Sequence, residues 1–73
     1  MPDKIFWKIQ YVNLCINAFA KRHKLSPSVS FRYLSDLRAI DFIDNNYEAE
    51  HIMPIDDTVD ALTIFCRRNG GSL

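Results

Sequence analysis

The chain has 73 residues, of which 48% are hydrophobic and 25% are charged, and its 9 Lys and Arg balance its 9 Asp and Glu. This composition excludes a disordered segment and a strongly basic nucleic-acid binder, and the length allows one small domain, residues 1–73, with little room for an enclosed active site. The zero net charge conceals an asymmetry, because residues 1–38 carry seven cations against two anions and residues 39–73 carry two against seven. We expect these +5 and −5 halves to pair at least partly when they pack together.

Residues 4–24 are predicted to form the first helix, because apolar residues recur at helical spacing with no internal Gly or Pro. One apolar row consists of Ile5, Ile9, Val12, Ile16 and Phe19. A second row, roughly opposite, consists of Trp7, Tyr11, Leu14 and Ala18. A helix that is apolar on two sides is either central and packed on both sides, or presents its second row to another chain. Both alternatives stay open here, and the second row is our candidate partner contact.

A second helix is predicted over residues 27–37, since Ser26 can cap it and Pro27 suits its first turn. Its inward stripe is expected to contain Val29, Tyr33, Leu34 and Leu37. A third, short helix is predicted over residues 39–46. These two helices loosely resemble a helix-turn-helix, which makes DNA binding the alternative function, although the acidic side chains of Asp41, Asp44 and Glu48 would repel phosphates.

Residues 48–55 are predicted to be a loop or a short extended piece, because Pro54 interrupts helix formation. The last helix is predicted over residues 57–69, capped by Asp56 or Asp57, with Val59, Leu62 and Cys66 on one face. The predicted fold is therefore a compact all-α bundle of about four helices.

No pattern of catalytic, cofactor-binding or metal-ligating residues is present, so we expect neither an enzyme nor a cofactor. Cys15 and Cys66 lie on apolar helix stripes and are expected to be buried free thiols rather than nucleophiles. The two histidines, His23 and His51, and the two cysteines lie far apart in the sequence and do not have the spacing of a metal-binding motif. Tyr47 and His51 have two interpretations: a core tyrosine beside a histidine that fixes the loop through a backbone carbonyl, or a small surface pocket that contacts a partner.

The chain has no apolar run long enough to span a membrane, and Met1-Pro2-Asp3-Lys4 does not begin a signal peptide. We therefore expect a cytoplasmic protein with no membrane association.

Several short motifs occur in a suggestive order: Cys15 to Ala20, Leu25-Ser26, Ile40-Asp41-Phe42-Ile43 and Tyr47-Glu48 with His51. In this order, over roughly residues 8–68, the chain resembles the small bacterial proteins of domain of unknown function family 3791. Arg38 departs from the pattern, since such proteins often have Gly there. The resemblance implies a small helical protein with no established activity. Its members are often encoded beside proteins that look like ADP-ribosyltransferases, which implies an accessory or antitoxin-like binding role.

These observations together favour a non-enzymatic protein-interaction module that binds a protein partner or associates with itself, for example as a homodimer. Nucleic-acid binding is the less favoured alternative.

Overall fold

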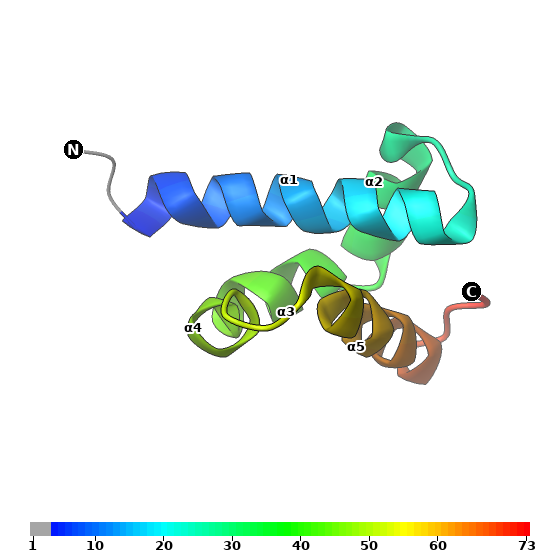
Figure 1. Cartoon of the computed structure of the whole chain (residues 1–73). Helices are drawn as coiled ribbons and strands as arrows, with labels where there is room; N and C mark the ends of the chain where they lie inside the picture. The colour runs from blue at the N-terminus through cyan, green and yellow to red at the C-terminus, as the bar shows by residue number, and fades with distance from the viewer. Residues whose placement is uncertain (1–3) are drawn as a thin grey trace.

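The structure is a computed structural model that describes residues 4–73. Residues 1–3 lie outside the described residues. They belong to the predicted single domain 1–73 and to the stretch Met1 to Lys4 that was considered as the start of a signal peptide. The described chain is all α-helical, which confirms the predicted fold class (Figure 1). The helices are α1 (Lys4–His23), α2 (Pro27–Asp36), α3 (Ala39–Asn45), α4 (Tyr47–Glu50) and α5 (Ile55–Arg68). Across residues 4–73, none of these helices has the length and apolar character needed to cross a membrane.

The junction between α1 and α2 is built from local capping. Lys24 adopts a left-handed backbone (φ 57°), which lets the N–H of Leu25 donate to the carbonyl of Ala20 at 2.8 Å and closes the last turn of α1. Ser26 then caps α2 as predicted, because its Oγ accepts a hydrogen bond at 3.2 Å from the N–H three residues later. Pro27 occupies the first turn, where its missing N–H costs nothing.

The inward face of α2 differs from the predicted stripe at one position. Val29 is 51% exposed, whereas Ser30 beside it is fully buried. The buried Ser30 hydroxyl donates to the carbonyl oxygen of Ile16 at 2.8 Å, which satisfies its polar group and lets α2 approach α1 closely. The remaining members of the predicted stripe are buried or half-buried: Tyr33, Leu34 and Leu37.

Arg38 forms the break between α2 and α3. Its backbone is left-handed (φ 63°), a conformation that glycine adopts without strain and that L residues with a side chain disfavour. The break lies where the sequence analysis placed it, at the position where the resembling proteins often have Gly. The conformation gives a physical reason for glycine there.

Three predictions about the start of α5 and the segment before it were wrong. Residues 48–50, predicted as part of a loop, belong to the short helix α4, and α5 begins at Ile55 rather than at residue 57. Neither Asp56 nor Asp57 caps α5: Pro54 holds the N-cap position without a side-chain hydrogen bond, and both acids lie in the first turn. In that turn their negative charges still interact favourably with the positive N-terminal end of the helix dipole.

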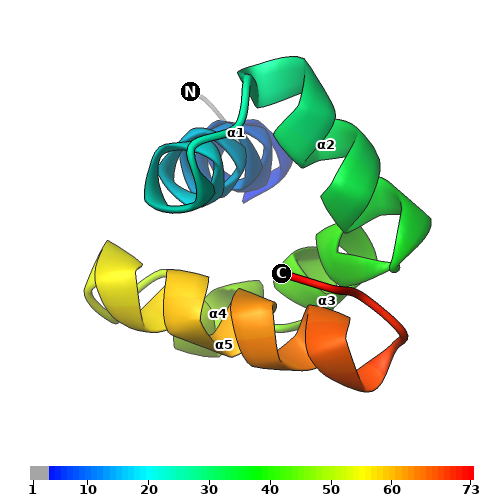
Figure 2. The same cartoon turned by 90° about the vertical axis from the view of Figure 1, so that its right-hand side faces the viewer.

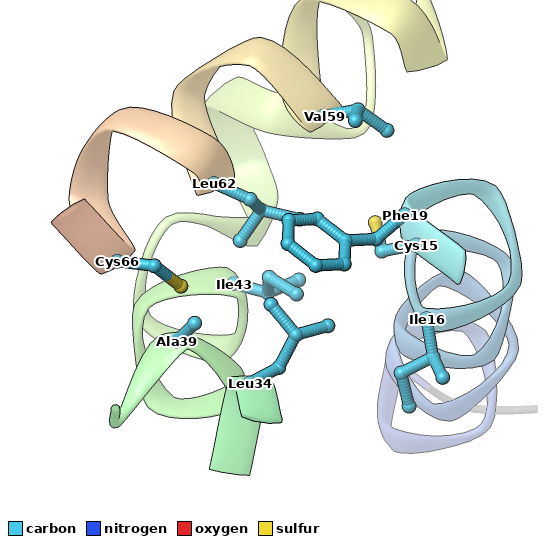
Figure 3. Packing of buried hydrophobic residues seen from close by; sticks show 9 residues of the cluster. All are labelled: Cys15, Ile16, Phe19, Leu34, Ala39, Ile43, Val59, Leu62 and Cys66. Atoms are coloured by element: carbon cyan, nitrogen blue, oxygen red, sulfur yellow. The ribbon is translucent and has the colours of Figure 1, made fainter. Parts of the chain in front are cut away.

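The helices enclose one core between α1 on one side and α5 on the other, with α2 and α3 joining them (Figure 2). Phe19 projects from α1 towards Leu62 of α5 and Leu34 of α2 (Figure 3). The predicted α5 stripe of Val59, Leu62 and Cys66 is buried as expected. The buried hydrophobic cluster contains Cys15, Ile16, Phe19, Leu34, Ala39, Ile43, Val59, Leu62 and Cys66.

The N-terminal part of α1 extends beyond this core. A 20-residue helix is about 30 Å long, and the molecule measures 39 × 22 × 21 Å, so α1 exceeds both short dimensions. Ile5 and Ile9 of the first predicted row are therefore 66% and 55% exposed, while Ile16 and Phe19 are buried. The C-terminal part of α1 packs against the core on one side, whereas Leu14, Asn17 and Lys21 on its other side are exposed.

The basic and acidic halves pair across the molecule as expected. All four ion pairs found within residues 4–73 join a cation of α1 to an acid of the second half. They are Lys4–Glu48, Lys8–Asp44, Arg22–Asp56 and Arg22–Asp60. Exposed pairs of this kind contribute little stability singly, but here they orient α3, α4 and α5 against α1.

Candidate interaction surface

The second predicted row of α1 divides into two pairs in the structure. Trp7 and Leu14 are each 52% exposed and point away from the core. Tyr11 and Ala18 are half-buried and pack against the core cluster. The division follows from helix geometry, because a step of four residues turns the side chain by about 40° around the helix axis. Tyr11 is therefore turned towards the core relative to Trp7, and Ala18 relative to Leu14. The exposed part of the candidate contact therefore consists of Trp7 and Leu14, with Phe6 edge-on to Trp7 at a ring-centroid distance of 5.1 Å.

Tyr11 joins three helices through its hydroxyl. The hydroxyl donates to the carbonyl oxygen of Glu50 at 3.0 Å and lies 2.9 Å from Oγ1 of Thr58. The Thr58 hydroxyl in turn lies 3.3 Å from a carboxylate oxygen of Glu50, to which it can donate. Burial raises the pKa of Tyr11 to about 12, so this hydroxyl stays protonated at neutral pH. The Tyr11 ring also stands edge-on to Tyr47 at 5.7 Å.

A depression of about 500 Å³ lies between α1 and the start of α5, beside Leu14. Leu14, Ala18 and Ile55 give it an apolar floor, and its other lining residues are Asn17, Lys21, Arg22 and Asp56. Figure 2 shows that the C-terminal part of α1 faces the first turns of α5, and the lining residues of the depression come from these two segments. Two of the four predicted contact residues, Leu14 and Ala18, therefore border one hollow.

Arg22 fixes the wall of this depression. Its Nη1 lies 2.5 Å from the carboxylate of Asp60, and its Nη2 lies 3.6 Å from the carboxylate of Asp56 and donates to the Asp56 carbonyl oxygen at 3.2 Å. Ile55 and Asp56 were not among the residues predicted for this surface. The opposite charges of the two segments could have indicated that the start of α5 meets the end of α1.

Tyr47 and His51 lie together because the short helix α4, which was not predicted, places residues four apart on the same side. Their rings are stacked at 4.4 Å with an angle of 8° between planes. His51 Nδ1 lies 2.6 Å from the carbonyl oxygen of Tyr47, to which a protonated Nδ1 donates. This contact fits the interpretation in which His51 fixes the turn. The depression beside Leu14 lies elsewhere, and the surface pocket at Tyr47 and His51 stays a prediction.

The two cysteines and His23 are buried or in contact with other residues of the fold. Cys15 and Cys66 are fully buried free thiols, as predicted. Burial raises the pKa of Cys15 to about 11 and also raises the pKa of Cys66, which opposes thiolate formation. The His23 ring is tilted against the Phe19 ring at a centroid distance of 4.3 Å, and its Nε2 lies 3.1 Å from Thr63 Oγ1. Within residues 4–73, no three His, Cys, Asp or Glu side chains are grouped to hold a metal ion.

Comparison with known proteins adds the family. The curated proteins gave no match to the chain, and the solved structures gave none either. A family model described as "Protein of unknown function (DUF3791)" matches residues 10–69, which include the end of α1, the Arg38 break, the Tyr47–His51 turn and all of α5. Residues 10–69 are most of the 73-residue chain, and the protein belongs to the DUF3791 family of proteins of unknown function.

Proposed function

We propose that this protein is a non-enzymatic protein-interaction module that binds through the exposed apolar surface of α1. The observation that carries the proposal is the exposure of Trp7 and Leu14, at 52% each, on one face of α1, where Leu14 also lines a hollow together with Ala18 and Ile55. Tryptophan is enriched among the residues that dominate binding at protein interfaces, and burial of either side chain removes apolar area from water. Tyr11 supports this surface from behind and keeps α1 in place.

The burial and the raised pKa values of the two cysteine thiols support binding rather than catalysis. A thiol needs thiolate character and access to react, and Cys15 and Cys66 have neither property. His23 and His51 each have a ring nitrogen at hydrogen-bonding distance from a partner in the fold. The proposal therefore assigns no catalytic residue and no cofactor.

The partner that the family resemblance implies is an ADP-ribosyltransferase-like protein, for which this chain would act as an accessory or antitoxin-like protein. DNA binding through α2 and α3 has less support. α3 contributes Asp41 and Asp44 to the surface, and Asp44 already pairs with Lys8 at 3.4 Å. Acidic side chains on the helix that would enter the groove oppose the phosphate backbone.

The proposal is tested by titrating the labelled chain with an ADP-ribosyltransferase-like protein. The double variant Trp7→Ala with Leu14→Ala should weaken binding about tenfold or more, while far-UV circular dichroism shows an intact fold. A matched control exists on α2, where Phe31 and Val29 are each 51% exposed. Their double alanine variant should bind like the wild type.

Three results would refute the proposal. The first is an equal loss of binding in both double variants, and the second is no association of the wild type with itself or with that protein. The third is salt-dependent binding to random duplex DNA that is lost on Arg32→Ala and Arg38→Ala, which would establish the DNA-binding alternative.

A further inference from the structure

The surface of α1 that faces away from the core carries one continuous stripe. Its members are spaced three and four residues apart, as on one face of a helix, and all are exposed. The stripe consists of Trp7, Gln10, Leu14, Asn17 and Lys21. It is centred on Leu14, with the large aromatic ring at one end and the cation at the other.

The depression between α1 and α5 borders only the C-terminal half of this stripe. Leu14, Asn17 and Lys21 line it, together with Ile55 of α5. The N-terminal half instead presents Trp7, which is 52% exposed on the part of α1 that extends beyond the core. One molecule therefore carries a protruding aromatic side chain and, on the same face, a hollow of about 500 Å³.

A two-fold arrangement brings the exposed ring of one copy to the hollow of the other. Trp7 and Lys21 are each seven residues from Leu14, which is about 10.5 Å along the helix. We propose that a second copy of the chain binds here, with the two α1 helices antiparallel and Leu14 at the axis. Trp7 of the second copy then enters the depression against Ala18 and Lys21. This inference rests on the proposed function and names the chain itself as a partner.

The charges favour the antiparallel arrangement. Lys21 carries the one charge on the stripe, and in this arrangement its ammonium meets the electron-rich face of the indole ring of the second copy. The two Lys21 side chains lie far apart, and each chain has zero net charge. A parallel pair would place Lys21 against Lys21 and Trp7 against Trp7, and would leave both depressions unfilled. The contact is isologous and closes on itself, as a two-fold dimer requires.

Cysteine cross-linking tests the register without changing Trp7, Leu14 or Lys21. In the proposed dimer, Gln10 of one copy is about 1.5 Å along the axis from Asn17 of the other. Mixing Gln10→Cys with Asn17→Cys chains under mild oxidation should therefore give a disulfide-linked heterodimer. Gln10→Cys alone should not cross-link, because its two copies are about 12 Å apart along the axis. The wild type is the control, since Cys15 and Cys66 are fully buried.

Sedimentation equilibrium measures the association itself. Trp7→Ala and, as a second variant outside the core, Lys21→Ala should each weaken the dimer, the former about tenfold or more. Phe31→Ala removes a ring of the same exposure from α2 and should leave the dimer unchanged. A wild type that is monomeric at the highest attainable concentration, a dimer that is insensitive to Trp7→Ala, or cross-linking of Gln10→Cys with itself would overturn the inference.

Failure of this inference is distinguishable from failure of the proposed function. A monomeric chain that binds an ADP-ribosyltransferase-like protein through Trp7 refutes the dimer and leaves the proposed function standing. A chain that does neither refutes both.

Discussion

The Tyr11 hydroxyl lies 2.9 Å from Oγ1 of Thr58, a residue 47 positions further along the chain, and this contact joins the beginning of α5 to α1. The same hydroxyl donates to the Glu50 carbonyl, so one side chain holds α4 as well. The row that contains Tyr11 therefore serves two purposes, with Tyr11 holding the fold and Trp7 and Leu14 exposed.

Tyr11→Phe tests the structural role of this hydroxyl. The variant keeps the ring but removes the hydrogen bonds to Glu50 and Thr58, and we expect a loss of about 1 kcal/mol in the free energy of unfolding. Urea denaturation followed by circular dichroism measures it. Tyr47→Phe is the control, because the Tyr47 hydroxyl makes no hydrogen bond within residues 4–73. Equal stability of the two variants would show that the Tyr11 hydrogen bonds contribute nothing.

Arg38→Gly should stabilise the protein. Arg38 has a left-handed backbone, and relief of this strain outweighs the greater freedom that glycine gives the unfolded chain, leaving a gain of roughly 0.5–1 kcal/mol. Arg32→Gly, at an exposed site inside α2, should instead cost about 1 kcal/mol. Thermal unfolding of both variants checks the opposite signs. A loss of stability in Arg38→Gly would contradict the assigned backbone conformation.

Gly71→Ala should destabilise the fold by steric overlap. A Cβ at Gly71 would meet the Tyr33 hydroxyl, lie 2.7 Å from Leu37 Cδ1 and lie 2.8 Å from the carbonyl oxygen of Cys66. We expect a loss of about 1–3 kcal/mol in the free energy of unfolding, measured by urea denaturation. Wild-type stability in this variant would mean that the segment after α5 does not pack against α2 as described.

The stability of the protein should fall in mildly acidic solution because of His23. Burial, together with the charges of Arg22 and Arg67, lowers the pKa of His23 from its ordinary value of 6.5. The unfolded chain therefore takes up the proton first, so this contribution to stability is complete above about pH 6.5 and is lost as the pH falls through the lowered pKa. Unfolding midpoints at about pH 7.5 and about pH 5.5 measure the change. The decrease should shrink in His23→Gln and persist in His51→Gln, and the opposite pattern would assign it to His51.

Buried residues and helix boundaries could be predicted from the sequence only where a segment has a regular apolar pattern. The buried face of α5 could be predicted because Val59, Leu62 and Cys66 repeat on one side of the helix, and all three are buried. The predicted stripe of α2 included Val29 and missed Ser30, because hydrophobicity alone does not register a hydroxyl that is buried against the Ile16 carbonyl. Pro54 signalled the end of a helix but not that the four residues of α4 precede it.

The candidate surface could be predicted only in part for a similar reason. The spacing of Trp7, Tyr11, Leu14 and Ala18 placed them in one row, but periodicity does not say where a long helix leaves its core. Only the packing of α1 against α5 shows that Tyr11 turns inward to Thr58 and that Leu14 borders a depression with Ile55. Long-range contacts of this kind leave no local pattern in the sequence.

The fluorescence of Trp7 tests the central claim most directly, because it is the one tryptophan in the chain and lies at the proposed contact. The account predicts that its emission shifts to shorter wavelength and becomes protected from iodide quenching as the protein concentration rises, and when an ADP-ribosyltransferase-like protein is added. An emission maximum and an iodide accessibility that stay unchanged under both conditions would contradict the assignment of α1 as the interaction surface.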